Sequence, residues 1–147
     1  MEVIKREAKD IDKFVKVCFI GSSGGGKTSL IRMLTDERFI EEISSTIGFD
    51  FTFKDKKMDN NLIRFQFWDS AGQERYQAIS PIHYKSIKFL YQDANIVILV
   101  YDVNEREEVN KLPYWFSEIE KHAPKDVKKI IIGNKVDLLA GKISNPL

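Results

Sequence analysis

The stretch Gly21-Ser22-Ser23-Gly24-Gly25-Gly26-Lys27-Thr28 constrains the fold of this chain more than any other part of it. It follows an apolar run at residues 14–20 that is typical of a buried strand, and it precedes residues 29–34, whose apolar spacing suits a helix. A strand, a glycine-rich turn and a helix in that order match the pattern G-x-x-x-x-G-K-[ST] of a phosphate-binding loop. The sequence therefore predicts an anion site at the N-terminus of the helix.

The chemistry of this phosphate loop follows from its residue types. Glycines permit the backbone torsions and the close approach that a loop wrapped around a phosphate needs, and the amide groups then point at the anion. We expect Lys27 to reach the outer phosphates and the Thr28 hydroxyl to ligate Mg²⁺. The alternative, a flexible Gly/Ser turn, is disfavoured by the full-length match in its proper context. The expected nucleotide-binding residues of the loop are Gly21, Ser22, Ser23, Gly24, Gly25, Gly26, Lys27, Thr28 and Ser29.

Length and composition exclude several other classes. The 147 residues are enough for one domain with a real core, and 43% hydrophobic with 31% charged residues is ordinary for a globular protein. A formal net charge of +1 argues against nucleic acid as the main partner. The single cysteine, Cys18, lies inside the first predicted strand, so we expect a buried thiol in a reducing compartment. Without a membrane-length apolar run, signal peptide or lipidation motif, a cytoplasmic monomer with no lipid anchor is expected.

The apolar patterning predicts strands that alternate with helices. Strands are expected at 14–20, 49–54, 62–68, 95–101 and 130–133, and helices at about 27–35 and after 101 to about 122, with Pro113 in the first turn or at a kink. The second and third strands form a hairpin because turn residues separate them. A tail is expected at 1–12, a surface loop at 36–48, and a loop grading into helix at 69–93. The expected class is a doubly wound α/β sheet with one antiparallel hairpin strand, binding ligands at the carboxyl ends of its strands.

Two further motifs follow predicted strands. In Asp69-Ser70-Ala71-Gly72-Gln73, the aspartate can hold Mg²⁺ directly or through water, the Gly72 amide can approach a γ-phosphate, and Gln73 can orient a water for in-line attack. In Asn134-Lys135-Val136-Asp137, the carboxylate can accept two N–H donors from a guanine edge, a pattern that adenine does not present. Either motif alone is a weak signal. Their order after the phosphate loop predicts a site for a guanine nucleotide.

With these motifs the chain resembles the Ras superfamily of small GTPases and, within it, the Rab family. The resemblance covers about residues 13–139 and is carried by the phosphate loop and by segments 45–51, 68–76 and 134–137. It implies a small GTPase domain over residues 13–147 that is incomplete at its C-terminus, without the last strand and helix. It also implies a switch that binds GTP or GDP with Mg²⁺, hydrolyses GTP slowly, and recruits effectors in its GTP state during vesicle trafficking.

The resemblance also assigns roles to single residues. Thr46 corresponds to the threonine that ligates Mg²⁺ and touches the γ-phosphate only in the triphosphate state, and Phe39 to the aromatic that packs on the guanine ring. Phe51 and Trp68 match two of the three aromatics through which Rab proteins meet effectors, with His83 in the third position. The resemblance implies as catalytic residues Lys27, Gly72 and Gln73, as metal ligands Thr28, Thr46 and Asp69, and as further nucleotide ligands Gly72, Asn134, Lys135 and Asp137.

The expected regulators are an exchange factor and a GTPase-activating protein. No arginine lies at residues 43–45 to act as a finger beside Thr46. Slow intrinsic hydrolysis is therefore expected, with an activating partner worth ~10³–10⁵ in rate.

The chain departs from the family pattern in two places. Before the strand at 95–101 it runs roughly seven residues longer, about two helical turns, with residues 88–94 as the addition. This addition either lengthens a helix and presents Phe89, Leu90 and Tyr91 to a partner, or is an error in the sequence. The chain also stops soon after Asp137, before the last strand, base loop, helix and prenylated tail of the family, so membrane association is expected only for a longer form.

Two alternatives to a cycling switch stay open. The first is a binding module that meets partners through its switch face without cycling, which the early stop favours and the intact phosphate-loop residues oppose. The second is an ATPase or kinase with the same loop, which Asn134 and Asp137 oppose because their motif reads guanine. A change of base preference on substituting Asp137 would separate the second alternative from a GTPase.

Overall fold

The computed structural model describes residues 10–36, 49–70 and 88–139. Its elements are β1 (Lys13–Ile20), α1 (Lys27–Asp36), β2 (Phe49–Met58), β3 (Asn61–Ser70), β4 (Ile96–Asp102), α3 (Arg106–Asn110), α4 (Leu112–His122), β5 (Lys128–Asn134) and the 3₁₀ helix η3 (Val136–Leu139). Residues 88–91 are helical as well. The expectations for residues 1–9, 37–48, 71–87 and 140–147 lie outside the described residues, and the division into a tail and a domain stays a prediction.

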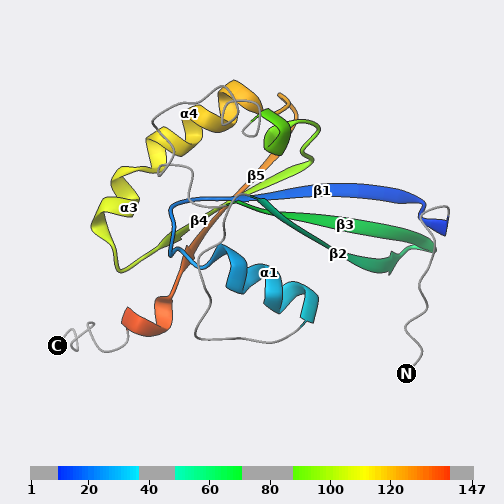
Figure 1. The fold of residues 1–147 in the computed structure, drawn as a ribbon, viewed down its shortest axis with the longest axis horizontal. Helices are drawn as coiled ribbons and strands as arrows, with labels where there is room; N and C mark the ends of the chain where they lie inside the picture. The colour runs from blue at the N-terminus through cyan, green and yellow to red at the C-terminus, as the bar shows by residue number, and fades with distance from the viewer. Residues whose placement is uncertain (1–9, 37–48, 71–87, 140–147) are drawn as a thin grey trace.

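The five strands form one sheet in the order β2-β3-β1-β4-β5. β2 pairs with β3 antiparallel, and the remaining neighbours are parallel. From β1 the chain passes to the edge strand β2, returns as β3 beside β1, and then crosses to β4 and β5 on the other side, so the strand order reverses next to β1 (Figure 1). Ligands of doubly wound sheets bind at such a switch point, beyond the carboxyl ends of the strands. The expected fold class is confirmed, and the phosphate loop follows β1 at that point.

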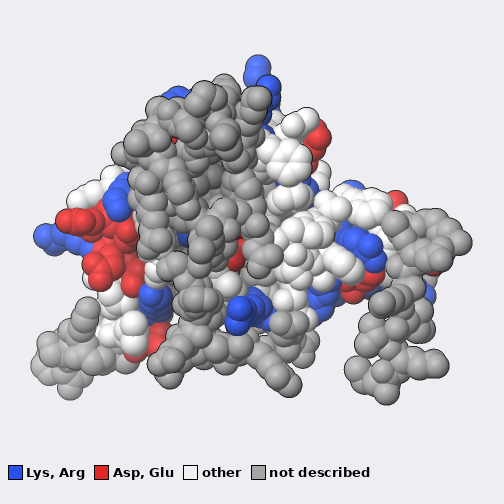
Figure 2. All heavy atoms as spheres, viewed as in Figure 1, with Lys and Arg blue, Asp and Glu red and all other residues white. Residues whose placement is uncertain are grey.

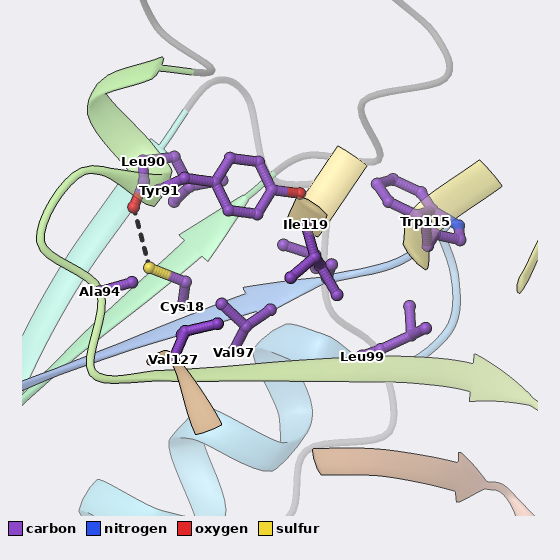
Figure 3. Packing of buried hydrophobic residues seen from close by; sticks show 10 residues of the cluster. Cys18, Leu90, Tyr91, Ala94, Val97, Leu99, Trp115, Ile119 and Val127 are labelled. Carbon is purple, nitrogen blue, oxygen red and sulfur yellow. Dashed lines mark hydrogen bonds between the residues drawn. The ribbon is translucent and has the colours of Figure 1, made fainter. Parts of the chain in front are cut away.

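Helices cover both faces of the sheet. α1 lies below it in Figure 1, while α3, α4 and the helical turn at 88–91 lie above it. Two apolar clusters fill the space between these layers. The lower cluster consists of Val17, Phe19, Ile31, Phe67, Ile98 and Val100. The upper cluster consists of Cys18, Ile20, Leu90, Tyr91, Ala94, Val97, Leu99, Trp115, Ile119 and Val127 (Figure 3).

The expectation of a buried thiol in β1 is confirmed. Cys18 is fully buried, and its Sγ donates a hydrogen bond to the Leu90 carbonyl oxygen over 2.9 Å, drawn as the dashed line in Figure 3. Burial raises the pKa of the Cys18 thiol to about 12, against a small opposing effect of Lys16. The thiol is therefore a packing group held in its neutral form.

The added segment is part of the core, which corrects one expectation. Leu90 and Tyr91 are fully buried beside Trp115 and Ile119, and only Phe89 is exposed, with 54% of its surface accessible. The expectation that Leu90 and Tyr91 face a partner is wrong, because both side chains fill the gap between the sheet and α4. Of the three side chains named in that expectation, only Phe89 is left for contacts with another molecule.

Three boundaries differ from the sequence expectations. The hairpin turn is confined to Asp59 and Asn60, whose φ angles of 47° and 66° suit the tight turn that joins two twisted strands. β3 continues through Ser70, so Asp69 lies in a strand rather than a loop. The segment after β4 is two helices, and Pro113 lies in the first turn of the second, where its missing N–H costs no hydrogen bond.

The surface of the described residues carries charges of both signs. Acidic side chains gather over α3, at the left of Figure 2, while lysine and arginine side chains are scattered over the rest of that face. Within the described ranges, no helix has the length and apolar character needed to cross a membrane.

Candidate functional site

The phosphate loop takes backbone torsions that require glycine. Gly21, Gly24 and Gly26 have φ angles of 132°, 83° and 100°. A Cβ on Gly21 would overlap the carbonyl oxygen of Val100 in the neighbouring strand β4. The loop is therefore held against the central strands, and the sequence-based reason for its glycines holds at these positions.

Lys27 begins α1, and its side chain folds back into the phosphate loop. Its side chain is buried, and its Nζ donates hydrogen bonds to the carbonyl oxygens of Gly21 over 2.6 Å and Ser22 over 2.9 Å. The Ser22 hydroxyl is also buried and has no hydrogen-bond partner among the described residues. An ammonium group held by the carbonyl oxygens of the loop provides the positive charge that a bound phosphate requires.

Thr28 and Asp69, both named above as expected Mg²⁺ ligands, are in contact. Thr28 lies in the first turn of α1, and its Oγ1 donates a hydrogen bond to Oδ2 of Asp69, near the end of β3. Asp69 is buried, and the adjacent Ser70 donates from Oγ to the Phe19 carbonyl oxygen over 2.7 Å, which ties the end of β3 to β1. A hydroxyl and a carboxylate at one point form a hard oxygen pair, the ligand type that Mg²⁺ prefers. The residues present therefore fit that ion.

The predicted base motif contacts the phosphate loop directly. Asn134 Nδ2 donates to the Gly25 carbonyl oxygen over 2.9 Å, and Lys135 Nζ donates to the Gly24 carbonyl oxygen over 2.5 Å. A Cβ on Gly26 would overlap the Asn134 side-chain nitrogen. Asp137 follows in η3 with an exposed side chain. Two motifs more than a hundred residues apart in sequence thus form one site at the carboxyl edge of the sheet.

Two residues at this edge were missed by the sequence analysis. Asp102 ends β4, and its Oδ2 lies 3.4 Å from Lys135 Nζ. Asn104 donates from its backbone N and its Nδ2 to Oδ1 of Asp102, each over 2.9 Å, and Nδ2 also lies 3.0 Å from the Lys135 carbonyl oxygen. Burial alone would raise the pKa of Asp102, but the hydrogen bonds from Asn104 and the charge of Lys135 outweigh it and lower the pKa. The signal in the sequence was the aspartate that ends the apolar run of β4, since polar residues at the carboxyl end of a parallel strand often belong to a ligand site.

Some predicted site residues lie outside the described part of the chain. These are Phe39, Thr46, Gly72, Gln73 and His83, and their roles stay predictions.

A row of four aromatic side chains crosses the sheet face beside the 88–91 turn. Ring centroids lie 6.5 Å apart between Phe53 and Phe51, 5.0 Å between Phe51 and Trp68, and 5.4 Å between Trp68 and Phe89. The ammonium of Lys16 lies 4.9 Å from the Trp68 centroid and 5.3 Å from that of Phe89. The same ammonium donates to the carbonyl oxygens of residues 89 and 92, so it holds the added segment against this aromatic row.

Comparison with known proteins places the chain in a family. A sequence model of the Ras family matches residues 16–145. The GTP-binding protein yptV2 of Volvox carteri is 38% identical over 133 residues, which are 90% of this chain and 58% of that protein. The Ras-related protein Rab-12 of Homo sapiens is 40% identical over 133 residues, 90% of this chain and 52% of that protein. The GTP-binding protein YPTM2 of Zea mays is 37% identical over 134 residues, 91% of this chain and 63% of that protein.

The chain thus spans between 52% and 63% of the length of these relatives. The family match begins at residue 16 within β1 and covers the described elements from there to η3, including the phosphate loop and the base motif that contacts it. This chain belongs to the Ras family, and the resemblance to a Rab-type small GTPase that its motifs carry is confirmed.

Proposed function

We propose that this chain is a guanine-nucleotide switch that hydrolyses GTP slowly and recruits effectors in its GTP state during membrane trafficking. The observation that carries the proposal is the direct contact between the two ligand-reading motifs, Asn134 with Gly25 and Lys135 with Gly24. A phosphate loop on its own holds any nucleotide. Joined to a motif that ends in Asp137, it fits a nucleotide whose base offers two N–H donors to a carboxylate.

The nucleotide is held at its phosphates by the loop and by Lys27. Backbone amides of the loop and the N-terminus of α1 would bind the phosphates, and the buried Lys27 ammonium would offset their charge. Thr28 and Asp69 would hold Mg²⁺, with Thr46 as a third ligand in the triphosphate state. When bound, this ion supplies neutralisation of phosphate charge.

Hydrolysis in this proposal depends mainly on positioning. Lys27 stabilises charge on the outer phosphate oxygens, Gly72 offers its amide to the γ-phosphate, and Gln73 orients the attacking water. Because residues 43–45 contain no arginine, the intrinsic rate is low and a GTPase-activating protein raises it by ~10³–10⁵. An exchange factor completes the cycle by releasing GDP.

The aromatic row formed by Phe53, Phe51, Trp68 and Phe89 is the proposed effector surface. Phe51 and Phe53 are 45% and 48% exposed, and large rings at that exposure are typical of sites that bind proteins. The resemblance to small GTPases implies that residues 36–48 and 69–85 respond to the bound nucleotide, so we expect effectors to distinguish the GTP state from the GDP state. We expect the chain to act in the cytoplasm as a monomer.

The first experiment identifies the nucleotide. The purified chain is denatured, and any released nucleotide is separated by chromatography. One equivalent of GDP or GTP supports the proposal, whereas ADP or ATP contradicts it. An empty but folded chain that also binds no added GDP would instead favour the non-cycling binding module.

A second experiment tests the base site. In Asp137→Asn the side chain presents one donor and one acceptor in place of two acceptors, so affinity should move from guanosine towards xanthosine diphosphate, whose base carries an acceptor at that edge. Asp126→Asn, which removes an exposed carboxylate before β5, is the matched control and should leave the preference unchanged. Equal guanine preference in both variants would contradict the role of Asp137.

The effector surface is tested by its dependence on nucleotide state. Chain loaded with a non-hydrolysable GTP analogue or with GDP serves as bait, with and without the paired change Phe51→Ala and Trp68→Ala. Capture should require the GTP analogue and should disappear in the double variant. Met58→Ala, at the far end of the same hairpin, is the control. Capture that survives the loss of both rings would place the effector site elsewhere.

A further inference from the structure

The side chain of Lys135 is held from two sides. Its Nζ donates to Gly24 of the phosphate loop over 2.5 Å, and the same Nζ lies 3.4 Å from Oδ2 of Asp102. The Lys135 side chain is 35% exposed and that of Asp102 only 13%, so the carboxylate forms the more rigid half of the pair. A lysine side chain has high rotamer entropy, and one hydrogen bond to a loop carbonyl immobilises it poorly.

The backbone at this point is held as well. Lys135 has a φ of 63°, a backbone conformation that residues other than glycine rarely adopt. Asn104 Nδ2 donates to the Lys135 carbonyl oxygen, and the Val103 amide donates to the Asn134 carbonyl oxygen over 3.1 Å. Asn104 in turn donates twice to Asp102. The end of β4 therefore fixes both the backbone and the ammonium of Lys135.

We propose that Asp102 is a positioning residue for nucleotide binding, whose carboxylate, oriented by Asn104, fixes the Lys135 ammonium against the phosphate loop. Asp102 does not touch the nucleotide in this arrangement. It acts through Lys135, which joins the base motif to the loop around the phosphates. The kinetic test of this inference rests on the proposed guanine-nucleotide function. The arrangement of Asp102, Asn104 and Lys135 can also be tested without nucleotide.

The kinetic test measures release of a fluorescent GDP analogue into excess unlabelled GDP. Asp102→Asn keeps the side-chain shape and an acceptor for Asn104 but removes the charge, so release should be roughly three- to tenfold faster. Because the pair is partly exposed, added salt should accelerate release from the unchanged chain and should have less effect on Asp102→Asn. Asp126→Asn, a surface carboxylate at the opposite end of β5, is the matched control and should not alter the rate.

A double-mutant cycle separates positioning from general support of the strand end. If Asp102 acts through Lys135, Asp102→Asn should add less than about twofold to the release rate of Lys135→Met. Effects that multiply in the double variant would overturn the proposal. A release rate for Asp102→Asn equal to that of Asp126→Asn would overturn it too.

A titration by NMR of the carboxyl carbon of Asp102 needs no nucleotide. The pKa of Asp102 should be below its usual value in the unchanged chain and should rise in Lys135→Met. If the chain binds no guanine nucleotide, the proposed function fails and this titration alone decides the further inference. An Asp102 pKa that is the same in both chains would then refute it.

Discussion

Three glycines of the phosphate loop share a positive φ but differ in what surrounds them. Alanine should therefore lower the free energy of unfolding by a different amount at each position. Around Gly24 nothing lies within 4 Å of an added Cβ. Alanine there meets only the torsional cost of its φ of 83°, ~1–2 kcal/mol. The lower entropy of the unfolded chain returns ~0.4–1 kcal/mol. A net loss of about 1 kcal/mol should lower Tm by roughly 2–4 °C.

Gly21 stands at the other extreme. An added Cβ there would lie closer than 3.0 Å to the Val100 carbonyl oxygen, a separation that real Cβ atoms essentially never show. Relief requires a shift of β4, a central strand, so an overpacking cost of ~1–3 kcal/mol adds to the torsional cost. We expect a total on the order of 4 kcal/mol, which lowers Tm by more than about 8 °C or prevents folding.

Gly26 lies between these extremes because its neighbour is a side chain. Alanine there displaces Asn134 and breaks the hydrogen bond to Gly25, which adds ~1 kcal/mol to the torsional cost. Asn134→Ala should therefore lower the free energy of unfolding less in the Gly26→Ala chain than in the unchanged chain. Urea denaturation followed by circular dichroism measures the series. A Gly21→Ala chain as stable as Gly24→Ala would refute the reasoning.

Further predictions concern the upper core and its anchor. Burial holds the Cys18 pKa near 12, so at pH 8 a thiol reagent should label the native chain ~10³-fold more slowly than the unfolded chain, as followed by absorbance. The unfolded thiol ionises at about 8.5, so stability should fall as pH rises above that value, and it should fall less in Cys18→Ala. Tyr91→Phe removes a buried hydroxyl that has no hydrogen-bond partner among the described residues, and should raise unfolding free energy by about 1 kcal/mol in urea titration. Lys16→Met removes two hydrogen bonds to the carbonyls of residues 89 and 92, and the Gln92 amide should then exchange faster with deuterium, with no change expected for amides in α1.

The parts of the fold that follow from local chemistry were predictable from the sequence. The continuous apolar run of β4 and the alternation in β2 predicted strands within about four residues of their observed ends. The phosphate loop was predictable because its glycines, lysine and threonine are consecutive. For Pro113 the sequence left two possibilities, the first turn of a helix or a kink. The structure has it in the first turn of α4, because Lys111 is both the C-cap of α3 and the N-cap of α4.

The contacts that were missed depend on residues far apart in sequence. Leu90 and Tyr91 belong to a short segment with no clear period, and their burial depends on Trp115 and Ile119 of α4. The contact between Asp102 and Lys135 could not be predicted from the sequence. It depends on the pairing of β4 with β5, which brings Asn134 opposite Asp102. In both cases the sequence shows the residue type but not the surface that it meets.

The chain's two tryptophans differ in how deeply they are buried, and this gives the molecule two optical reporters. Trp115 is 1% exposed within the upper cluster. Trp68 is half-buried at the margin of that cluster, where its ring contacts Phe51 and Phe89 and has the Lys16 ammonium beside it. A Trp115→Phe chain would emit only from the proposed effector surface, so its emission would shift when a partner displaces water from Trp68. A Trp68→Phe chain would emit only from the core and would report unfolding alone. Docking and denaturation could then be followed by the same fluorescence measurement, each in its own variant, without an attached dye.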